Sequence, residues 1–349
     1  MRNFRLGILF AAGITVALAQ TTPKEWNDQA VAAADRGDHA EAERHYLKAV
    51  EGWTAQGAAY DAQLAATLMN LGQTYSAQGK RKQAAEVFEN SLAKFRRIFG
   101  PRHEWTLNSM NLLGATYLML GDTGRSAALF EEALPIEREV LPNSIYMARS
   151  LLGLATIDLI ANKFEPALAQ AEEGLRVTLV AQGESSMDAA MAYTTTAEVH
   201  RTAKRYDRAL PLYRKARAIY EKLLGAEHQR VAGVLSQEGL ILMIEGKYAL
   251  AEKEMVRSLA IVKKSCPGCT YELWVGECNL GLLRYKQKRY AEADALLSHS
   301  LEIQEKHMTR PGPEMVGTIQ ALAATREKLK RFEDAARLNQ RATLLLSYR

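Results

Sequence analysis

The sequence is poor in the residues that build disulfide scaffolds and interrupt helices. Its 349 residues include only three cysteines and nine prolines. A framework of several disulfides is therefore excluded, and long helices are left uninterrupted. No sustained alternation of β-branched and polar residues indicates strands. Since Ala, Leu, Glu, Lys and Arg, which favour helix, are abundant, the composition predicts an all-α protein.

A large excess of charge of one sign is also lacking. There are 45 Lys plus Arg against 40 Asp plus Glu, a formal net charge of +5. Arg2 and Arg5 lie in a segment that we expect to be removed, which leaves 43 − 40 = +3. No basic stripe with interleaved aromatic residues is present. We therefore predict no nucleic-acid partner.

Patterns typical of catalysis or metal binding are missing as well. The seven histidines show no HExxH spacing or other metal-ligand spacing. We interpret His39 and His200 as packed residues, and His103 and His228 as loop or capping residues. The sequence thus predicts that the protein is not an enzyme and has no metal and no cofactor.

The first residues have the pattern of an export signal. Arg2 and Arg5 precede an apolar stretch from Leu6 to Leu18, and Ala17-Leu18-Ala19 fits a small-x-small cleavage site. The apolar stretch is shorter than the ~20 residues of a spanning helix. We expect residues 1–19 to be a signal peptide, no membrane span in the mature chain, and a periplasmic or extracellular location in a bacterium.

From about residue 25 onward one unit recurs eight times. Its phase is marked by a small residue that recurs every 42 residues, with one step of 41. Two more small positions lie twelve residues before and seven residues after this marker. The marker positions are Ala42, Ala84, Ser126, Ala167, Ala209, Ala251, Ala293 and Ala335. The earlier positions are Ala30, Gly72, Gly114, Ala155, Ala197, Gly239, Gly281 and Ala323, and the later ones are Ala49, Ser91, Ala133, Gly174, Ala216, Ser258, Ser300 and Ala342.

Three positions restricted to Gly, Ala or Ser predict that two antiparallel helices approach closely in every unit, since larger side chains would push them apart. Turn signals stand between the paired helices, such as Gln78-Gly79-Lys80 and the Lys-Arg-aromatic run that ends at Tyr206. The predicted repeat units are 25–60, 63–104, 105–144, 145–186, 187–229, 230–272, 273–314 and 315–349. Together they make one predicted domain, residues 20–349.

The residues of these units resemble a known family. Leu71-Gly72, Tyr75, Ala84 and Phe88 have the spacing of the tetratricopeptide repeat. The 42-residue period and the Gly-x-x-His loops that begin at Gly100 and Gly225 resemble its kinesin-light-chain subclass. The resemblance implies a right-handed superhelical solenoid of about eight helix-turn-helix repeats, whose first helices line a groove that docks other proteins.

The family's geometry, carried over to this chain, places a mixture of polar and apolar side chains in that groove. Carboxamides could bond the backbone of an extended peptide, because each offers a donor and an acceptor. The apolar residues could receive its side chains. The predicted groove residues are Asn70, Gln73, Asn111, Leu118, Arg149, Leu152, Leu159, Thr194, Glu198, Arg201, Ser236, Leu240, Met243, Asn279, Leu282 and Tyr285.

The cysteines support other interpretations. Cys266-Pro267-Gly268-Cys269 replaces the loop between the sixth and seventh units, and Cys278 follows on the next helix. In an exported protein Cys266 and Cys269 are most simply a disulfide. A redox role would rest on the position of Cys269 before a helix start. A metal site of three cysteines lacks an evident fourth ligand, and Thr270 stands where haem attachment needs histidine.

Three functions follow from these observations. The first is a non-enzymatic scaffold outside the cytoplasm that binds a peptide segment or a folded partner in the groove. The second is a thiol-redox or metal-binding protein centred on the CPGC loop. The third is a self-assembling architectural solenoid, suggested by the apolar Leu344, Leu345 and Leu346 near the end of the chain.

Counting thiols separates the first function from the second. If Cys266 and Cys269 form a disulfide, denatured protein contains one reactive thiol without reductant and three with it. Replacing both residues by serine leaves partner binding unchanged, because the groove does not include them. Three thiols without reductant, or loss of partner binding in the serine variant, would contradict the structural-disulfide interpretation.

Overall fold

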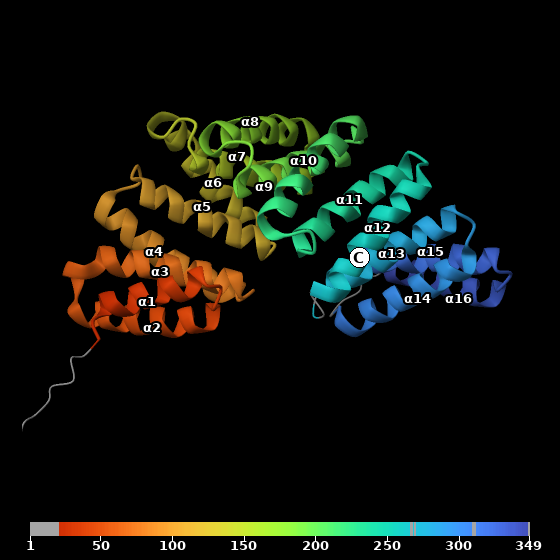
Figure 1. Ribbon diagram of the computed structural model, residues 1–349, viewed down its shortest axis with the longest axis horizontal. Helices are drawn as coiled ribbons and strands as arrows, with labels where there is room; N and C mark the ends of the chain where they lie inside the picture. The colour runs from red at the N-terminus through yellow and green to blue at the C-terminus, as the bar shows by residue number, and fades with distance from the viewer. Residues whose placement is uncertain (1–20, 266–267, 269, 309–311, 348–349) are drawn as a thin grey trace, which may run out of the picture. The chain divides into compact units, whose positions relative to one another are not determined.

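The computed structural model describes residues 21–265, 268, 270–308 and 312–347. Across these residues the chain forms α-helices and one short 3-10 helix, Ala58–Tyr60, without any strand (Figure 1). The predicted all-α solenoid of stacked helix pairs is therefore confirmed. The predicted signal peptide, Cys266 and Cys269 lie outside the described residues.

The helices fall into two compact units, divided after Gly121. Unit 1 contains α1 (Pro23–Asp35), α2 (His39–Gln56), α3 (Asp61–Ala77), α4 (Arg81–Phe99) and α5 (Glu104–Met119). Unit 2 begins with α6 (Thr123–Val140), α7 (Ile145–Ile160), α8 (Phe164–Gln182), α9 (Met187–Thr202) and α10 (Tyr206–Leu224). It continues with α11 (Gln229–Ile244), α12 (Tyr248–Ser265), α13 (Thr270–Lys286), α14 (Tyr290–His307), α15 (Pro313–Lys328) and α16 (Phe332–Ser347). Within each unit successive helices pack on one another. Odd-numbered helices are the first helices of the repeats and even-numbered helices the second.

The predicted small positions are buried in all eight repeats. In three repeats the small position that follows the marker by seven residues is serine, and its hydroxyl donates a hydrogen bond to a backbone carbonyl on the first helix of the same pair. Ser91 Oγ lies 2.8 Å from the oxygen of Ala65, and Ser258 Oγ lies 2.7 Å from that of Ala232. The same bond joins Ser300 Oγ to the Trp274 oxygen at 2.9 Å. A serine there thus satisfies its hydroxyl where a larger side chain would not fit.

The turn inside each pair needs one residue with a left-handed backbone. The residues with positive φ recur at the repeat period: Gly37, Gly79, Gly121, Asn162, Lys204, Gly246, Lys288 and Lys330. Glycine adopts this conformation without strain, whereas lysine pays a steric cost. The predicted turn signals are confirmed, including the lysines of the Lys-Arg-aromatic runs.

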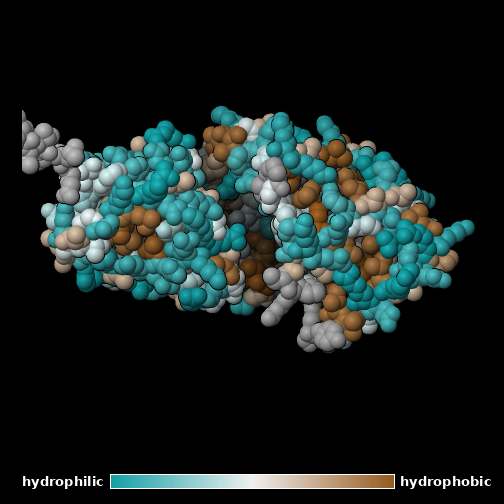
Figure 2. Space-filling view, turned by 90° about the horizontal axis from the view of Figure 1, so that it is seen from below, coloured by the Kyte–Doolittle hydropathy of each residue, from teal (hydrophilic) through white to brown (hydrophobic). Residues whose placement is uncertain are grey.

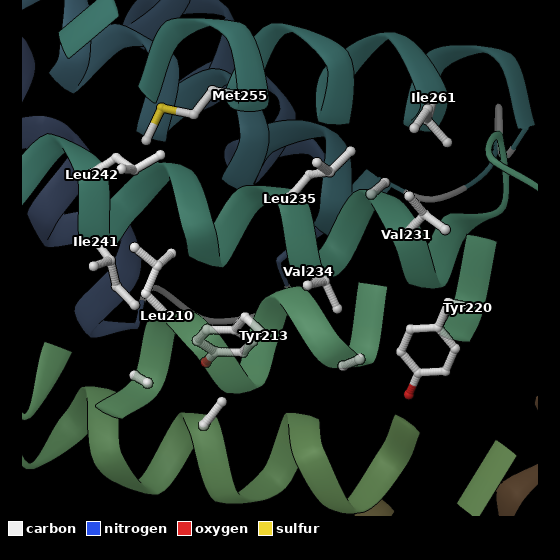
Figure 3. Close-up of a cluster of buried hydrophobic side chains, with 14 of the residues drawn as sticks. Leu210, Tyr213, Tyr220, Val231, Val234, Leu235, Ile241, Leu242, Met255 and Ile261 are labelled. Atoms are coloured by element: carbon white, nitrogen blue, oxygen red, sulfur yellow. The ribbon is translucent and has the colours of Figure 1, made fainter. Parts of the chain in front are cut away.

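Apolar side chains fill the space between the helices. In unit 2 a core cluster extends over α9 to α13, and Figure 3 shows Tyr213 beside Leu210 and Val234 at the α10–α11 contact. Tyr213 and Leu235 are fully buried. At ~25 cal/mol per Å² of apolar surface removed from water, such side chains supply most of the stabilisation of a helix stack.

Two glycines of α11 test the close approach. A Cβ on Gly239 would lie 2.6 Å from Met255 Cγ, whereas a Cβ on Gly233 would meet nothing within 4 Å. We expect Gly239→Ala to lower the free energy of unfolding by about 1–2 kcal/mol, because overpacking outweighs the gain in helix propensity. Gly233→Ala should raise it by about 0.5–1 kcal/mol. Urea unfolding measures both, and equal stabilisation by the two variants would contradict the close approach.

Candidate functional site

In unit 1 two predicted groove residues line a cavity on the first-helix side. Asn70 is half-buried and Gln73 is exposed, both on α3. They border a cavity of about 320 Å³ together with Asp35, His39 and Tyr46 of the first repeat. A carboxamide pair at an open cavity can bond a peptide backbone, as a donor and as an acceptor.

The two predicted groove residues of α5, Asn111 and Leu118, differ in how deeply they are buried. Asn111 is only 2% exposed, and its side-chain amide donates to the Leu107 carbonyl at 3.0 Å. This asparagine is therefore a buried residue that bonds its own helix, and not the groove-facing carboxamide that was predicted. Leu118 is half-buried.

On α7 the predicted groove residues make contacts with neighbouring helices. Arg149 Nη2 lies 3.2 Å from Asp188 Oδ1 at the start of α9, an ion pair between successive first helices. Leu152 packs against Gly174 of α8, the small position of that helix. Leu159 packs on the buried cluster that contains Ala155. The two leucines thus contribute to helix packing.

A connected polar cluster lies on α9 and α10. Glu198 accepts hydrogen bonds from Arg201 Nε at 3.0 Å and from the Tyr213 hydroxyl at 2.5 Å. Burial alone would raise the pKa of Glu198, but these hydrogen bonds and the charge of Arg201 outweigh it and lower the pKa. Burial raises the pKa of Tyr213. Thr194, one turn before Glu198, donates to the Ala190 carbonyl at 2.8 Å. Glu198 and Arg201 are therefore a fixed, charged pair.

Further along unit 2 the first helices bring another polar pair together. Asn279 Nδ2 of α13 lies 3.3 Å from Ser236 Oγ of α11. Leu240 and Met243 pack at the margin of the core cluster, and Tyr285 contacts Tyr290 edge to face at 5.6 Å between ring centroids. Leu282 is half-buried. Figure 2 shows a face on which small apolar patches are separated by hydrophilic residues.

One buried carboxylate was not predicted from the sequence. Glu238 on α11 is 1% exposed, and its Oε2 lies 3.1 Å from Arg217 Nη1. Arg217 also pairs with Glu254 at 3.3 Å, so one guanidinium serves two carboxylates. Burial raises the pKa of Glu238 to about 7. Its position in the repeat gave no signal, because its partner Arg217 comes from the neighbouring helix pair.

A cavity of about 1,100 Å³, which lies along α8 and α10 on the second-helix side, was not predicted from the sequence either. None of the predicted groove residues lines it. Leu179, Leu212 and Lys215 do. Exposed leucine and valine positions on a second helix gave no signal by themselves, since single apolar residues are common on protein surfaces.

Of the three cysteines, the structure describes only Cys278. Cys278 is half-buried with Sγ 3.6 Å from Thr318 Oγ1, and burial raises the pKa of its thiol. Such a thiol is a poor nucleophile at neutral pH.

Two of the predicted loop histidines cap helices. His103 Nδ1 accepts a hydrogen bond from Trp105 N at 3.2 Å, and His228 Nδ1 accepts one from Arg230 N at 3.1 Å, which confirms their capping role. In the part of the chain that the structure describes, no cluster of three His, Cys, Asp or Glu could hold a metal ion, and no helix is long and apolar enough to cross a membrane.

The repeat geometry and its small positions agree with a family comparison. The model of the tetratricopeptide repeat matches residues 25–93, 82–139 and 188–264, more than half of the chain. The chain belongs to the tetratricopeptide repeat family.

Individual relatives are distant. Protein KINESIN LIGHT CHAIN-RELATED 1 of Arabidopsis thaliana is 23% identical over an alignment of 317 residues, which covers 78% of this chain and 52% of that protein. This tetratricopeptide repeat chain thus spans about half the length of its curated relative. The apo form of the quorum sensor NprR from B. thuringiensis is similar in structure, with a TM-score of 0.68, 13% identity, and coverage of 93% of this chain and 87% of that one. A Rap protein complexed with Competence and Sporulation Factor has a TM-score of 0.61, 15% identity, and coverage of 88% and 80%. These structures share the fold.

Glu238 gives the stability of unit 2 a pH dependence. The ordinary pKa is 4.5 and the folded value is about 7, so the folded protein holds the proton more tightly. Stability from this group is complete below pH 4.5 and is lost as the pH rises through 7. We expect the unfolding free energy of the native protein, relative to Glu238→Gln, to fall by about 3 kcal/mol between pH 4.5 and pH 8. Urea unfolding at several pH values measures this, with the exposed Glu302→Gln as control. A constant difference would contradict the raised pKa.

Proposed function

We propose that the protein is a non-enzymatic docking protein that holds a peptide segment or a folded partner on its first-helix side. The observation that carries the proposal is the series of fixed polar pairs that link successive first helices, Arg149 with Asp188 and Asn279 with Ser236. Side chains already held in place lose little conformational freedom when a partner binds. Membership of the tetratricopeptide repeat family supports protein or peptide binding.

Two further observations support peptide recognition. The cavity at Asn70 and Gln73 offers carboxamides to a backbone. One structural neighbour is a quorum sensor, and another is complexed with a factor, as their names state. Because these likenesses show the fold alone, the kind of partner proposed here rests on the side chains of this chain. The clustered Lys and Asn that bind a terminal carboxylate in some relatives of the family are not reproduced, so we propose an internal segment.

The location is also part of the proposal. Residues 1–19 have the charge, apolar stretch and small-residue site of an export signal. We propose that docking takes place in the periplasm or outside the cell of a bacterium. Self-association is the second candidate function, since Leu344 and Leu346 of α16 are 52% and 44% exposed.

The test begins with a peptide selected for binding to the purified chain from a random library. If the first-helix side is the binding surface, Asn279→Ala or Arg201→Ala weakens the selected peptide about tenfold, because each removes a preorganised polar contact. Fluorescence anisotropy measures the dissociation constant. Lys222→Ala, an exposed position on the second helix α10, is the matched control.

The outcomes are distinct. Equal affinities for the native protein and both first-helix variants would overturn the proposal. Loss of binding in Lys222→Ala with retention in the others would place the surface on the second helices. A molecular mass that rises with concentration in light scattering, and falls on Leu344→Asp, would favour self-association.

A further inference from the structure

Ion pairs join neighbouring second helices at two repeat positions. At the first, the acidic residue after the marker small position pairs with the basic residue that precedes the next second helix. Glu43 lies 2.6 Å from Lys80 Nζ. Glu252 lies 3.2 Å from Arg289 Nη1, and Asp294 lies 3.1 Å from Arg331 Nη1. The partners are 37 residues apart in all three pairs. We call this arrangement rung A.

A second position, rung B, lies further along the same helices. Glu221 of α10 lies 2.9 Å from Arg257 of α12, and Glu305 of α14 pairs with Arg341 of α16. Between α6 and α8 the charges are exchanged, with Arg138 Nη2 2.8 Å from Glu173. Every pair of neighbouring second helices inside either unit, apart from α8 and α10, has an ion pair at rung A or at rung B.

Between α8 and α10 leucines occupy both acidic positions. Leu168 stands where rung A needs a carboxylate for Arg205, and Leu179 stands where rung B needs one for Lys215. Neither Arg205 nor Lys215 has a carboxylate partner among the described residues; Lys215 lies over the Tyr193 ring at 5.2 Å from its centroid. At both positions between α8 and α10 the basic residue is therefore present and the acidic residue is missing.

Leu179 and Lys215 of rung B line a groove of about 1,100 Å³ along α8 and α10, and Arg205 of rung A lines it as well. Its apolar lining includes Leu179, Leu212 and Val180, and Val180 is 65% exposed. Thr196 and His200 of α9 also line it. An apolar surface of this kind in a repeat protein is costly to leave in water, which favours an occupant.

The charges along the groove favour an acidic occupant. Four basic and three acidic side chains line it. Asp207 already has a neighbour, because it lies 3.7 Å from Arg208. Arg176, Arg205 and Lys215 then outnumber the two remaining carboxylates, those of Glu172 and Glu184, since burial lowers the pKa of His200 beside Glu172 and leaves its ring neutral at neutral pH.

We propose that the groove along α8 and α10 docks an acidic amphipathic segment of a partner protein. Its carboxylates pair with Arg205 and Lys215 and complete both rungs, while its apolar side chains cover Leu179, Val180 and Leu212. This surface is separate from the first-helix side. Ten residues separate Arg205 from Lys215, about 15 Å along a helix axis, so two carboxylates about ten residues apart on a docked helix reach both.

The probe is a fluorescein-labelled peptide designed as an amphipathic helix, with glutamates ten residues apart and leucines on the same side. A peptide with lysine in place of each glutamate is its counterpart. Fluorescence anisotropy gives the dissociation constants. We expect saturable binding of the glutamate peptide, at least tenfold weaker binding of the lysine peptide, and loss of affinity at high salt.

Charge reversal locates the binding surface. Lys215→Glu should weaken the glutamate peptide at least tenfold, whereas Lys222→Glu, the same change on the same helix outside the groove, should leave its affinity unchanged. Both lysines are exposed, so both variants should fold. Leu179→Glu supplies the missing acid of rung B and should also weaken the peptide, and circular dichroism verifies that this half-buried position tolerates the change.

Several results would overturn the proposal. They are the absence of saturable binding of the glutamate peptide below ~1 mM, equal losses in Lys215→Glu and Lys222→Glu, and equal affinity for the lysine peptide. Concentration-dependent mass that Lys215→Glu abolishes would show a second copy of this chain as the occupant instead. Asn279→Ala should leave this binding unchanged, so that failure here is distinguishable from failure of the first-helix docking surface.

Discussion

The close approach of paired helices is the constraint on which the rest of the structure depends. It requires a small residue at three positions of each repeat, and these positions are buried throughout both units. Since the two backbones are in contact there, the direction in which every other side chain of each helix points is fixed as well. The first helices can therefore present one set of side chains and the second helices another. The two candidate docking surfaces both follow from this division.

The sequence was sufficient to predict the parts of the fold that recur. Small residues at a constant period predicted the pairing, and glycine or a Lys-Arg run predicted the turn between paired helices, where Gly79 and Lys204 have a left-handed backbone. Such features are readable because the same backbone requirement acts at the same place eight times. The capping histidines His103 and His228 were readable for the same reason.

The candidate site was only partly predictable, because side-chain surroundings differ from repeat to repeat. Asn111 was predicted in the groove together with Asn70, yet it stands one position earlier in its repeat, where it is buried and bonds the Leu107 carbonyl. Glu238 is buried because Arg217 of the neighbouring pair reaches it, and that contact spans two repeats. The groove along α8 and α10 is lined by Leu179, at a position whose importance is visible only when the ion pairs of other repeats are known.

The contacts of unit 2 have a mechanical consequence. Each helix packs on the next one or two along the chain, and in the described residues no pairing of distant helices closes the stack. Stability in such an array is a sum of local repeat and interface contributions. A pulling force applied at the ends of unit 2 would then be borne in series, and the array would extend by opening its weakest junction first. The arginine–carboxylate pairs between second helices are partly exposed and add little at each junction, so the apolar packing between repeats decides which junction opens first.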